Sequence, residues 1–337
     1  MTAPTPAPKT VLPERISRFP FPLDRDTYRY SANVETARTT HRTAAGEWGA
    51  CVIDIDDQYA RELALRHEIL QADPSRCAIL PHMGPACWDA MLTLMRELSD
   101  AYPDTMTLCR DGDGWYWSNA LLGVEQHFRY GDDTSLSTDP LRFIASQVQE
   151  DIVVLEQRDG TLWADAGLVT FASNWSMSFN TGMSFLEIHG PVPRNYADGA
   201  IPRAERFLMR LQPGDAYRRV NWTSTVGHRL DTALETYADW GSDRVRILTA
   251  DIGTELHLRV EVQHLIRLPD TGAILFLIRT YLLPFADIAT VPEWRDRLAA
   301  VLAELPQDMA DYKGFGRIRD KAVLWLTAQA AGTQQGC

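Results

Sequence analysis

The feature that most constrains the fold is a run of alternating apolar and polar residues over 255–268. Every second side chain from Leu256 to Leu268 is apolar, apart from His264, and most of the intervening positions are polar. Because successive side chains of a strand point to opposite faces, this period of two predicts one long β-strand with an apolar and a polar face. The polar positions are His257, Arg259, Glu261, Gln263 and Arg267.

Shorter alternating segments on both sides predict that this strand belongs to an antiparallel sheet. A turn at 269–272 leads from it into a second β-rich run, and Asp159-Gly160 joins two further runs as a hairpin. Strands or hairpins are expected at 107–130, 153–158, 161–171, 216–226 and 273–283, and helices at 56–70, 85–102, 200–211, 292–304 and 317–329. Helices, then antiparallel hairpins with one intervening helix, then helices again predict an α+β fold rather than a parallel doubly wound sheet.

The composition limits the classes of function that the chain can have. The formal net charge of -12 gives an acidic surface, which opposes binding to nucleic acid or anionic lipid. No window approaches the ~18 apolar residues of a membrane helix. The five cysteines form no C-x-x-C pair, and neither a glycine-rich nucleotide loop nor an H-E-x-x-H motif occurs. We therefore expect a cytoplasmic protein with no nucleic-acid or membrane partner and no flavin, NAD or iron–sulfur group of its own.

One histidine has surroundings that suit a bound ligand. His189 stands between an apolar run that begins at Phe185 and the rigid exit Gly190-Pro191-Val192-Pro193. Apolar neighbours exclude water, the glycine allows a large group to approach the backbone, and the prolines fix the direction of the chain. This pattern favours an imidazole offered to a metal or macrocycle, and a core histidine satisfied by hydrogen bonds is the alternative. The same two interpretations apply to His264, on the apolar face of the long strand.

The polar face of the predicted sheet is a second candidate surface. Arg219 and Asn221 alternate along the strand 216–226, as Glu261 and Gln263 do along the long strand. If both strands lie in one sheet, these side chains can line a polarised pocket. The alternative is that they form the solvated side of an amphipathic sheet.

Several of these residues belong to a wider set of motifs that runs from Phe19 to Gly314. The most specific are Ile188-His189 with Pro191-Val192-Pro193, Arg206-Phe207, Arg219 with Asn221, the block Arg259, Glu261, Gln263, Leu265, Arg267-Leu268-Pro269, and Ile278-Arg279-Thr280-Tyr281-Leu282. Together they resemble the DUF3445 family, whose characterised member is the alpha subunit of a haem-dependent oxidative N-demethylase acting on dimethylamine. The resemblance implies a PAS-like domain, an antiparallel sheet with flanking helices, that holds haem b.

We expect this single haem-binding domain, with its N- and C-terminal helical extensions, to span residues 16–330. The proline-rich stretch 1–15 predicts a disordered leader, and 331–337 a flexible tail.

The resemblance implies that His189 is the proximal ligand of the haem iron, with His264 as second choice. The other ring nitrogen of His189 would donate to a carbonyl that orients the ring. From the chemistry of the reaction, we expect Arg219 and Asn221 to stabilise negative charge on reduced oxygen, and Glu261 to hold a protonated amine. Packing on the macrocycle is expected from Phe185, Ile188 and Val192, and binding of its propionates from Arg267 or Arg279.

The implied activity is oxidative N-demethylation of a small secondary methylamine, with O2 and electrons from a partner reductase, releasing formaldehyde. The family also implies partner subunits that carry FMN and a [2Fe-2S] cluster, fed by NADPH, and a subunit that binds tetrahydrofolate. Two other functions stay open. One is a haem-PAS sensor of gas or redox state, and the other is a haem-free protein that binds a small metabolite.

Overall fold

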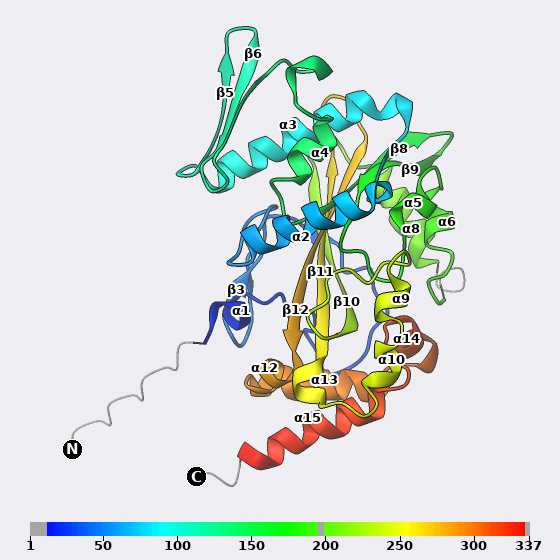
Figure 1. Ribbon diagram of the computed structural model, residues 1–337. Coiled ribbons are helices and arrows are strands. Elements are labelled where there is room, and N and C mark those ends of the chain that lie inside the picture. The colour runs from blue at the N-terminus through cyan, green and yellow to red at the C-terminus, as the bar shows by residue number, and fades with distance from the viewer. Residues whose placement is uncertain (1–11, 195–198, 334–337) are drawn as a thin grey trace, which may run out of the picture.

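The computed structural model describes residues 12–194 and 199–333, and its centre is a seven-stranded antiparallel sheet (Figure 1). The strand order is β1 (Glu35–Thr36), β10 (Ala216–Val226), β11 (Leu256–Arg267), β12 (Ile274–Pro284), β8 (Asp151–Arg158), β9 (Thr161–Leu168) and β4 (Cys77–Ile79). The alternating run at 255–268 thus forms an interior strand, hydrogen-bonded along its length to β10 on one side and β12 on the other.

Two smaller sheets lie outside the central one. They comprise β2 (His41–Arg42) with β3 (Glu47–Trp48), and β5 (Met106–Asp111) with β6 (Gly114–Asn119) and β7 (Val124–Phe128). The region 107–130, predicted as a hairpin or irregular β structure, is therefore a regular three-stranded sheet. The sequence Asp111-Gly112-Asp113-Gly114 forms the tight turn between β5 and β6. Asp111 and Gly114 are the last paired residues of the two strands, and Gly112 and Asp113 connect them.

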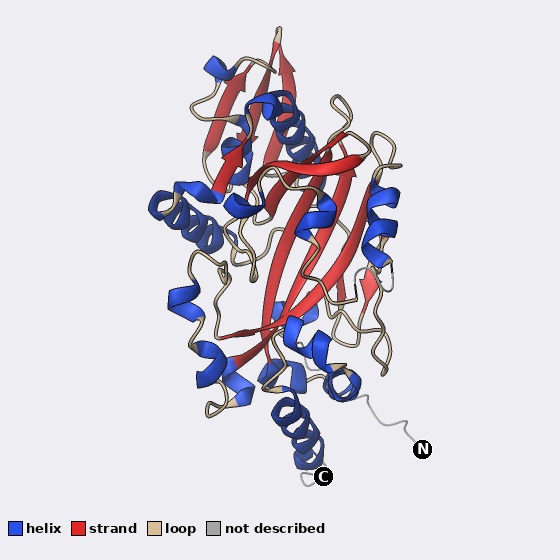
Figure 2. Cartoon of the chain, turned by 90° about the vertical axis from the view of Figure 1, so that its right-hand side faces the viewer, coloured by secondary structure: helices blue, strands red, loops and turns tan. Residues whose placement is uncertain are grey.

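Helices lie at both ends of the long strands and beside them (Figures 1 and 2). They are α1 (Glu14–Ser17), α2 (Tyr59–Ala72), α3 (Gly84–Ala101), α4 (Pro140–Ala145), α5 (Met177–Asn180), α6 (Phe185–Ile188), α8 (Ala200–Leu208), α9 (Tyr237–Trp240), α10 (Asp243–Arg246), α11 (Ile252–Glu255), α12 (Phe285–Ala289), α13 (Pro292–Glu304), α14 (Gln307–Tyr312) and α15 (Arg319–Thr333), with short 3-10 turns η1 (Pro74–Arg76), η2 (Pro81–Met83) and η3 (Asp133–Ser135). Within residues 12–194 and 199–333, no helix has the length and apolar character needed to cross a bilayer.

The α+β class is confirmed, and the predicted elements are present with shifted ends. Glu255 belongs to α11, so β11 begins one residue later than predicted. β9 stops at Leu168, short of its predicted end. The N–H groups of Thr170 and Phe171 donate instead to the buried carboxylate of Asp151, at 2.9 and 2.8 Å, and no longer continue the ladder.

The ends of the chain bear on the predicted leader and tail. Most of the leader, residues 1–11, and residues 334–337 of the tail lie outside the described residues. Helix α1 begins at Glu14, inside the predicted leader, and α15 extends to Thr333.

Both faces of β11 are buried. On its apolar face, Leu256, Leu258 and Val260 pack into a core with α12, α13 and α15, and Ile266 belongs to a second core with α3 and α4. On its polar face, the side chain of Arg259 is fully buried and that of Glu261 is only 6% exposed. Phe185 of α6 and Leu208 of α8 share a buried apolar cluster with Leu265, so these helices cover part of this face. The polar residues are therefore not the solvated side of an amphipathic sheet.

A buried arginine of α2 joins that helix to the sheet. Arg66 is 1% exposed, and its guanidinium lies 5.1 Å from the centroid of the Phe171 ring. It donates to Oγ1 of Thr170 at 3.1 Å, to the carbonyls of Ala145 at 2.8 Å, of Gln149 at 3.0 Å and of Val148, and to the carboxylate of Asp151 at 3.1 Å. One side chain thus satisfies several carbonyls that would otherwise be buried without a donor.

The N-terminal segment packs against residues from the far end of the sequence. β1 pairs with β10, and Arg218 donates to the carboxylate of Glu35, 183 positions away, at 2.7 Å. Phe21 stacks on Trp294 of α13 with ring centroids 4.8 Å apart. The edge of the sheet and one of its cores therefore depend on contacts between residues far apart in the sequence.

Candidate functional site

His189 directly follows α6, and local sequence determines its position. The Ser184 hydroxyl accepts the N–H of Glu187, and the Glu187 carboxylate accepts the N–H of Ser184, which together form a capping box. A helix of four residues is unstable by itself, so these caps and the burial of Phe185 in the core hold it in place. His189 is the residue at its C-terminal end.

The imidazole of His189 is held in one orientation. Its Nδ1 donates to the carbonyl of Phe185 at 2.7 Å, and the two rings lie 4.2 Å apart. Burial, together with the positive charge of Arg219, lowers the pKa of His189 to about 4, although the Phe185 carbonyl opposes this. The ring is therefore neutral at pH 7, with its basic lone pair at Nε2, on the side away from that carbonyl.

The apolar residues expected to contact a macrocycle flank His189. Phe185 is 9% exposed, and Ile188 is half-buried against the same core. Val192 is half-buried, and its N–H donates to the carbonyl of His189 at 3.1 Å. Of these side chains, that of Phe185 contacts the imidazole directly, with ring centroids 4.2 Å apart.

Arg219, Asn221 and Glu261 are brought together on the polar face. Arg219 is paired with Gln263 across the sheet, and Asn221 with Glu261. Nη1 of Arg219 donates to Oε1 of Gln263 at 2.8 Å. Nδ2 of Asn221 and Nε2 of Gln263 donate to Oε2 of Glu261 at 3.3 and 3.0 Å. The charge of Arg219 acts on the pKa of His189, so the imidazole lies within electrostatic range of this network.

Arg259 balances the charge of Glu261. Its Nε donates to Oε1 of Glu261 at 3.1 Å, and its Nη1 donates to the carbonyl of Leu230 at 2.7 Å. Within the described residues, Glu261 thus accepts three N–H groups, one each from Arg259, Asn221 and Gln263. A carboxylate offers about four lone-pair positions, so one remains for a donor from a ligand.

Lys313, to which no sequence pattern assigned a role, adjoins this network. It is 7% exposed, and its Nζ donates to the carbonyl of Trp222 at 2.8 Å and lies 4.3 Å from the centroid of that indole. Burial, with help from the charge of Arg219, lowers the pKa of Lys313 to about 7, and Glu261 opposes the shift. The Trp222 carbonyl and indole stabilise the charged ammonium of Lys313, but the loss of hydration on burial lowers its pKa by more than they raise it. Lys313 can therefore hold or release a proton near neutral pH.

The lowered pKa of Lys313 predicts a pH-dependent stability. Between pH 7 and about 10.5 the unfolded chain holds a proton on Lys313 that the folded chain lacks, so the free energy of unfolding rises with pH in this window. Lys313→Met removes that rise, which approaches about 1.4 kcal/mol per pH unit. Urea unfolding at pH 7, 8.5 and 10 measures it. Lys321→Met, which replaces an exposed lysine of α15, is the control. If the free energy of unfolding depends on pH in the same way for wild type and Lys313→Met, the prediction is wrong.

Three predicted site residues lie apart from this cluster. Arg279 projects from the opposite face of the sheet, where it pairs with Glu62 at 2.8 Å and Asp56 at 2.6 Å. His264 is on that face too, and burial lowers its pKa to about 3. Neither ring nitrogen of His264 has a hydrogen-bond partner among the described residues. Arg267 shares the polar face but stands at the end of β11, and the register places it four positions beyond Gln263.

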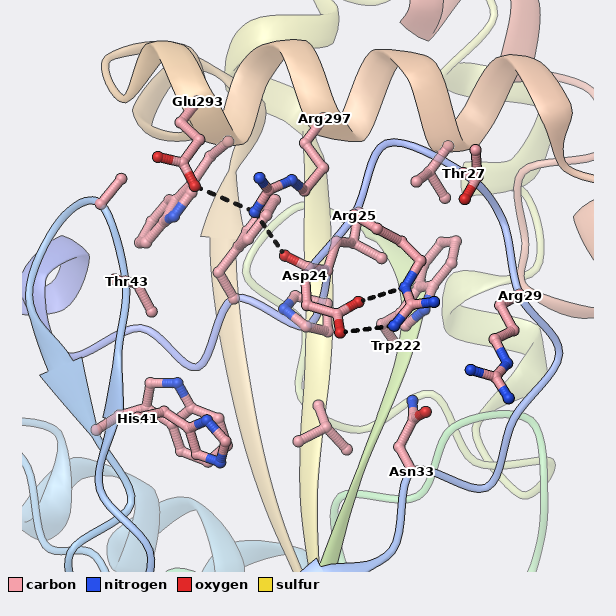
Figure 3. Close-up of a pocket in the computed structure, with 18 of the residues that line it drawn as sticks. Asp24, Arg25, Thr27, Arg29, Asn33, His41, Thr43, Trp222, Glu293 and Arg297 are labelled. Atoms are coloured by element: carbon pink, nitrogen blue, oxygen red, sulfur yellow. Dashed lines mark hydrogen bonds and ion pairs between the residues drawn. The ribbon is translucent and has the colours of Figure 1, made fainter.

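A cavity of about 580 Å³ lies on the face of the sheet opposite His189 (Figure 3). Trp222 of β10 lines it, as do Glu293 and Arg297 of α13, which form an ion pair of 3.1 Å. The rest of its wall is largely residues 21–44. Its volume suits a small molecule, but none of the site residues predicted from the sequence lines it.

A comparison with protein-family models connects the chain to known proteins. The model described as haem-dependent oxidative N-demethylase, alpha subunit-like, matches residues 46–323. The matched stretch includes α6, the strands β8 to β12 and Lys313. It leaves out residues 21–44, which form much of the wall of the cavity.

Proposed function

Because this chain belongs to the family of haem-dependent oxidative N-demethylase alpha subunit-like proteins, we propose that it binds haem b through His189 and demethylates a small secondary methylamine. The reaction uses O2 and electrons from a reductase. The proposal rests on one observation above all: the imidazole of His189 is neutral, held in one orientation, and within electrostatic range of Arg219, which belongs to the network with Asn221 and Glu261.

The surroundings of His189 fit an axial ligand of haem iron. Such a ligand offers one ring nitrogen to the metal, while a hydrogen bond from the other fixes the ring and raises its basicity. The Phe185 carbonyl holds Nδ1, so Nε2 is the atom that would bind iron. Phe185, Ile188 and Val192 supply apolar surface for the macrocycle. The hairpin β8–β9, the helical crossover to β10 and the three long antiparallel strands support a PAS-like arrangement.

The residues of the polar face orient the substrate and balance charge. Bound haem supplies the activation of O2 and the electron transfer that side chains lack. Glu261, which is buried and keeps one lone-pair position, holds the ammonium form of the amine by a charge-assisted hydrogen bond. Arg219 and Asn221 provide N–H donors where negative charge develops on oxygen. Oxidation converts N–CH3 to N–CH2OH, and the C–N bond then breaks to release formaldehyde while nitrogen takes the hydroxyl proton.

The family description as an alpha subunit implies partner subunits. We propose that these carry FMN and a [2Fe-2S] cluster fed by NADPH, and that a tetrahydrofolate-binding subunit accepts the one-carbon product. The residues Arg267 and Arg279 remain proposals for the propionates. Arg279 can serve only if the macrocycle reaches the opposite face of the sheet, because that is where its guanidinium lies.

Turnover tests the proposed function. We expect haem-loaded protein supplied with a reductase, NADPH and O2 to release formaldehyde when dimethylamine is added, and none when the amine is omitted. If the protein shows a haem Soret band but yields no amine-dependent formaldehyde with any reductase, the enzyme proposal fails and a sensor is favoured. If haem-replete expression gives no Soret band, the haem proposal itself fails and a haem-free metabolite-binding protein is favoured.

Glu261→Gln tests the role of the carboxylate in that reaction. Loss of one charge-assisted hydrogen bond, about 1.5–3 kcal/mol, should lower kcat/KM for the amine about 10- to 100-fold, mostly through KM. Glu205→Gln is a matched control, since Glu205 is also 6% exposed but lies on α8 and accepts from Thr161. Equal losses in both variants, or retention of the wild-type KM in Glu261→Gln, would rule out this role.

A further inference from the structure

A second group of potential ligand atoms lies near the edge of the sheet, outside the site described above. His82 belongs to η2, Glu156 to β8 and Asp165 to β9. Nε2 of His82 is 3.2 Å from Oε2 of Glu156 and 3.0 Å from Oδ2 of Asp165. Ligand atoms at about 2.0–2.1 Å from a tetrahedral zinc ion are about 3.3 Å apart, so these separations suit a shared ion.

A β-bulge aims the Asp165 carboxylate at His82. Val154 pairs with Ala166 and Leu155 with Ala164, so Asp165 is the extra, unpaired residue of β9. Bulges redirect side chains and are frequent next to functional sites. The bulged backbone is also tied to the segment that carries His82, since the carbonyl of Asp165 accepts the N–H of Leu80 at 2.9 Å.

Asp165 carries an incompletely satisfied charge. Its side chain is 0% exposed, and its Oδ1 has no hydrogen-bond partner in the part of the chain that the structure describes. A buried carboxylate oxygen without a donor is costly, and a cation bound to this carboxylate would offset the cost. The side chains of His82 and Glu156 are 45% and 36% exposed, so an ion can enter from solvent.

Arg158 at present balances the two carboxylates. Its Nη1 donates to Oε2 of Glu156 at 2.6 Å and to Oδ2 of Asp165, and its guanidinium lies 4.7 Å from the centroid of the Trp163 ring. The Arg158 side chain is 35% exposed, so it can turn outward without leaving a buried cavity. A divalent ion bound there would place two positive charges between Glu156 and Asp165, where Arg158 now places one. Arg158 is therefore a competitor for the ion rather than a ligand.

We propose that His82, Glu156 and Asp165 form a binding site for a divalent transition-metal ion, separate from the proposed haem site. Imidazole and carboxylate ligands suit zinc and its neighbours. Three protein ligands leave the remaining coordination position to water, as in open zinc sites. This inference does not depend on the proposed N-demethylation.

Calorimetric titration of Zn²⁺ into the full-length, chelator-treated protein tests the site. We expect one saturable site, weakened at least about tenfold by His82→Ala or Glu156→Gln. Arg158→Ala should bind Zn²⁺ at least about tenfold more tightly, because it removes the competing charge. His127→Ala is the matched control, since His127 is an exposed histidine that also contacts a carboxylate, that of Asp111 at 2.8 Å.

Two outcomes would overturn the proposal. Binding that His82→Ala and Glu156→Gln leave unchanged would place the ion elsewhere. Failure of Arg158→Ala to bind Zn²⁺ more tightly than wild type would leave the cluster as an ion-pair network only. Thermal unfolding gives an independent readout, because Zn²⁺ should raise the Tm of wild type and of His127→Ala but not of His82→Ala.

Discussion

His189→Ala is expected to abolish haem retention. Loss of an outer hydrogen-bond partner of a metal ligand already costs 10- to 100-fold in affinity, so loss of the ligand itself should cost at least about 100-fold. The imidazole is held at its Nδ1 by the Phe185 carbonyl, at the C-terminal end of α6. The Soret absorbance of protein purified after haem-replete expression, divided by its absorbance at 280 nm, measures the effect.

His264→Leu is the control for this substitution. His264 is buried on the opposite face, and its ring makes no hydrogen bond within the described residues, so leucine should leave the haem content unchanged. Free imidazole added to His189→Ala should partly restore the Soret band, which separates loss of a ligand from loss of the fold. If His264→Leu loses haem while His189→Ala keeps it, the assignment of the ligand is wrong.

Arg66→Met is expected to destabilise the fold by about 3–5 kcal/mol, because it leaves the Asp151 carboxylate buried without its cation. Methionine fills much of the volume but donates to none of the carbonyls that Arg66 satisfies. Asp151 also accepts from Thr170 and Phe171, so the loss reaches the end of β9. The free energy of unfolding from urea titration measures the effect.

The matched control is Arg61→Met on the same helix. Arg61 is exposed and its only described hydrogen bond is to Gln58 at 3.2 Å, so its replacement should change the free energy of unfolding by less than about 0.5 kcal/mol. Similar stabilities for Arg66→Met and Arg61→Met would show that the buried ion pair is not required.

The long strands were the most predictable part of the fold. β10 has the bounds that its alternation predicted, because a period of two reports backbone geometry directly. The burial of the polar face was not predictable in the same way. The sequence alternates in the same way whether the polar side chains contact water or other groups of the protein. Arg259, for example, donates to the Glu261 carboxylate and to the Leu230 carbonyl instead of to water.

The candidate site shows the same division. The hydrogen bond from Nδ1 of His189 goes to the carbonyl of Phe185, only four residues earlier. Local sequence was therefore enough to single out this part of the site. The proximity of Lys313 to Glu261 arises only from tertiary packing, because α14 is six residues long and has no periodic signal. The face of β12 that Arg279 occupies follows only from the register with β11, where Arg279 is paired with Val262.

The pairing of β1 with β10 and of Phe21 with Trp294 also has a consequence for protein synthesis. At about 5–20 residues per second, the ribosome needs on the order of 15 to 50 s to make the chain between those two aromatic residues. Throughout that interval Phe21 lacks the indole on which it stacks. The core that Phe21 shares with α13 can therefore close only late in synthesis, and slowing translation before residue 294 should delay that closure without changing the final fold.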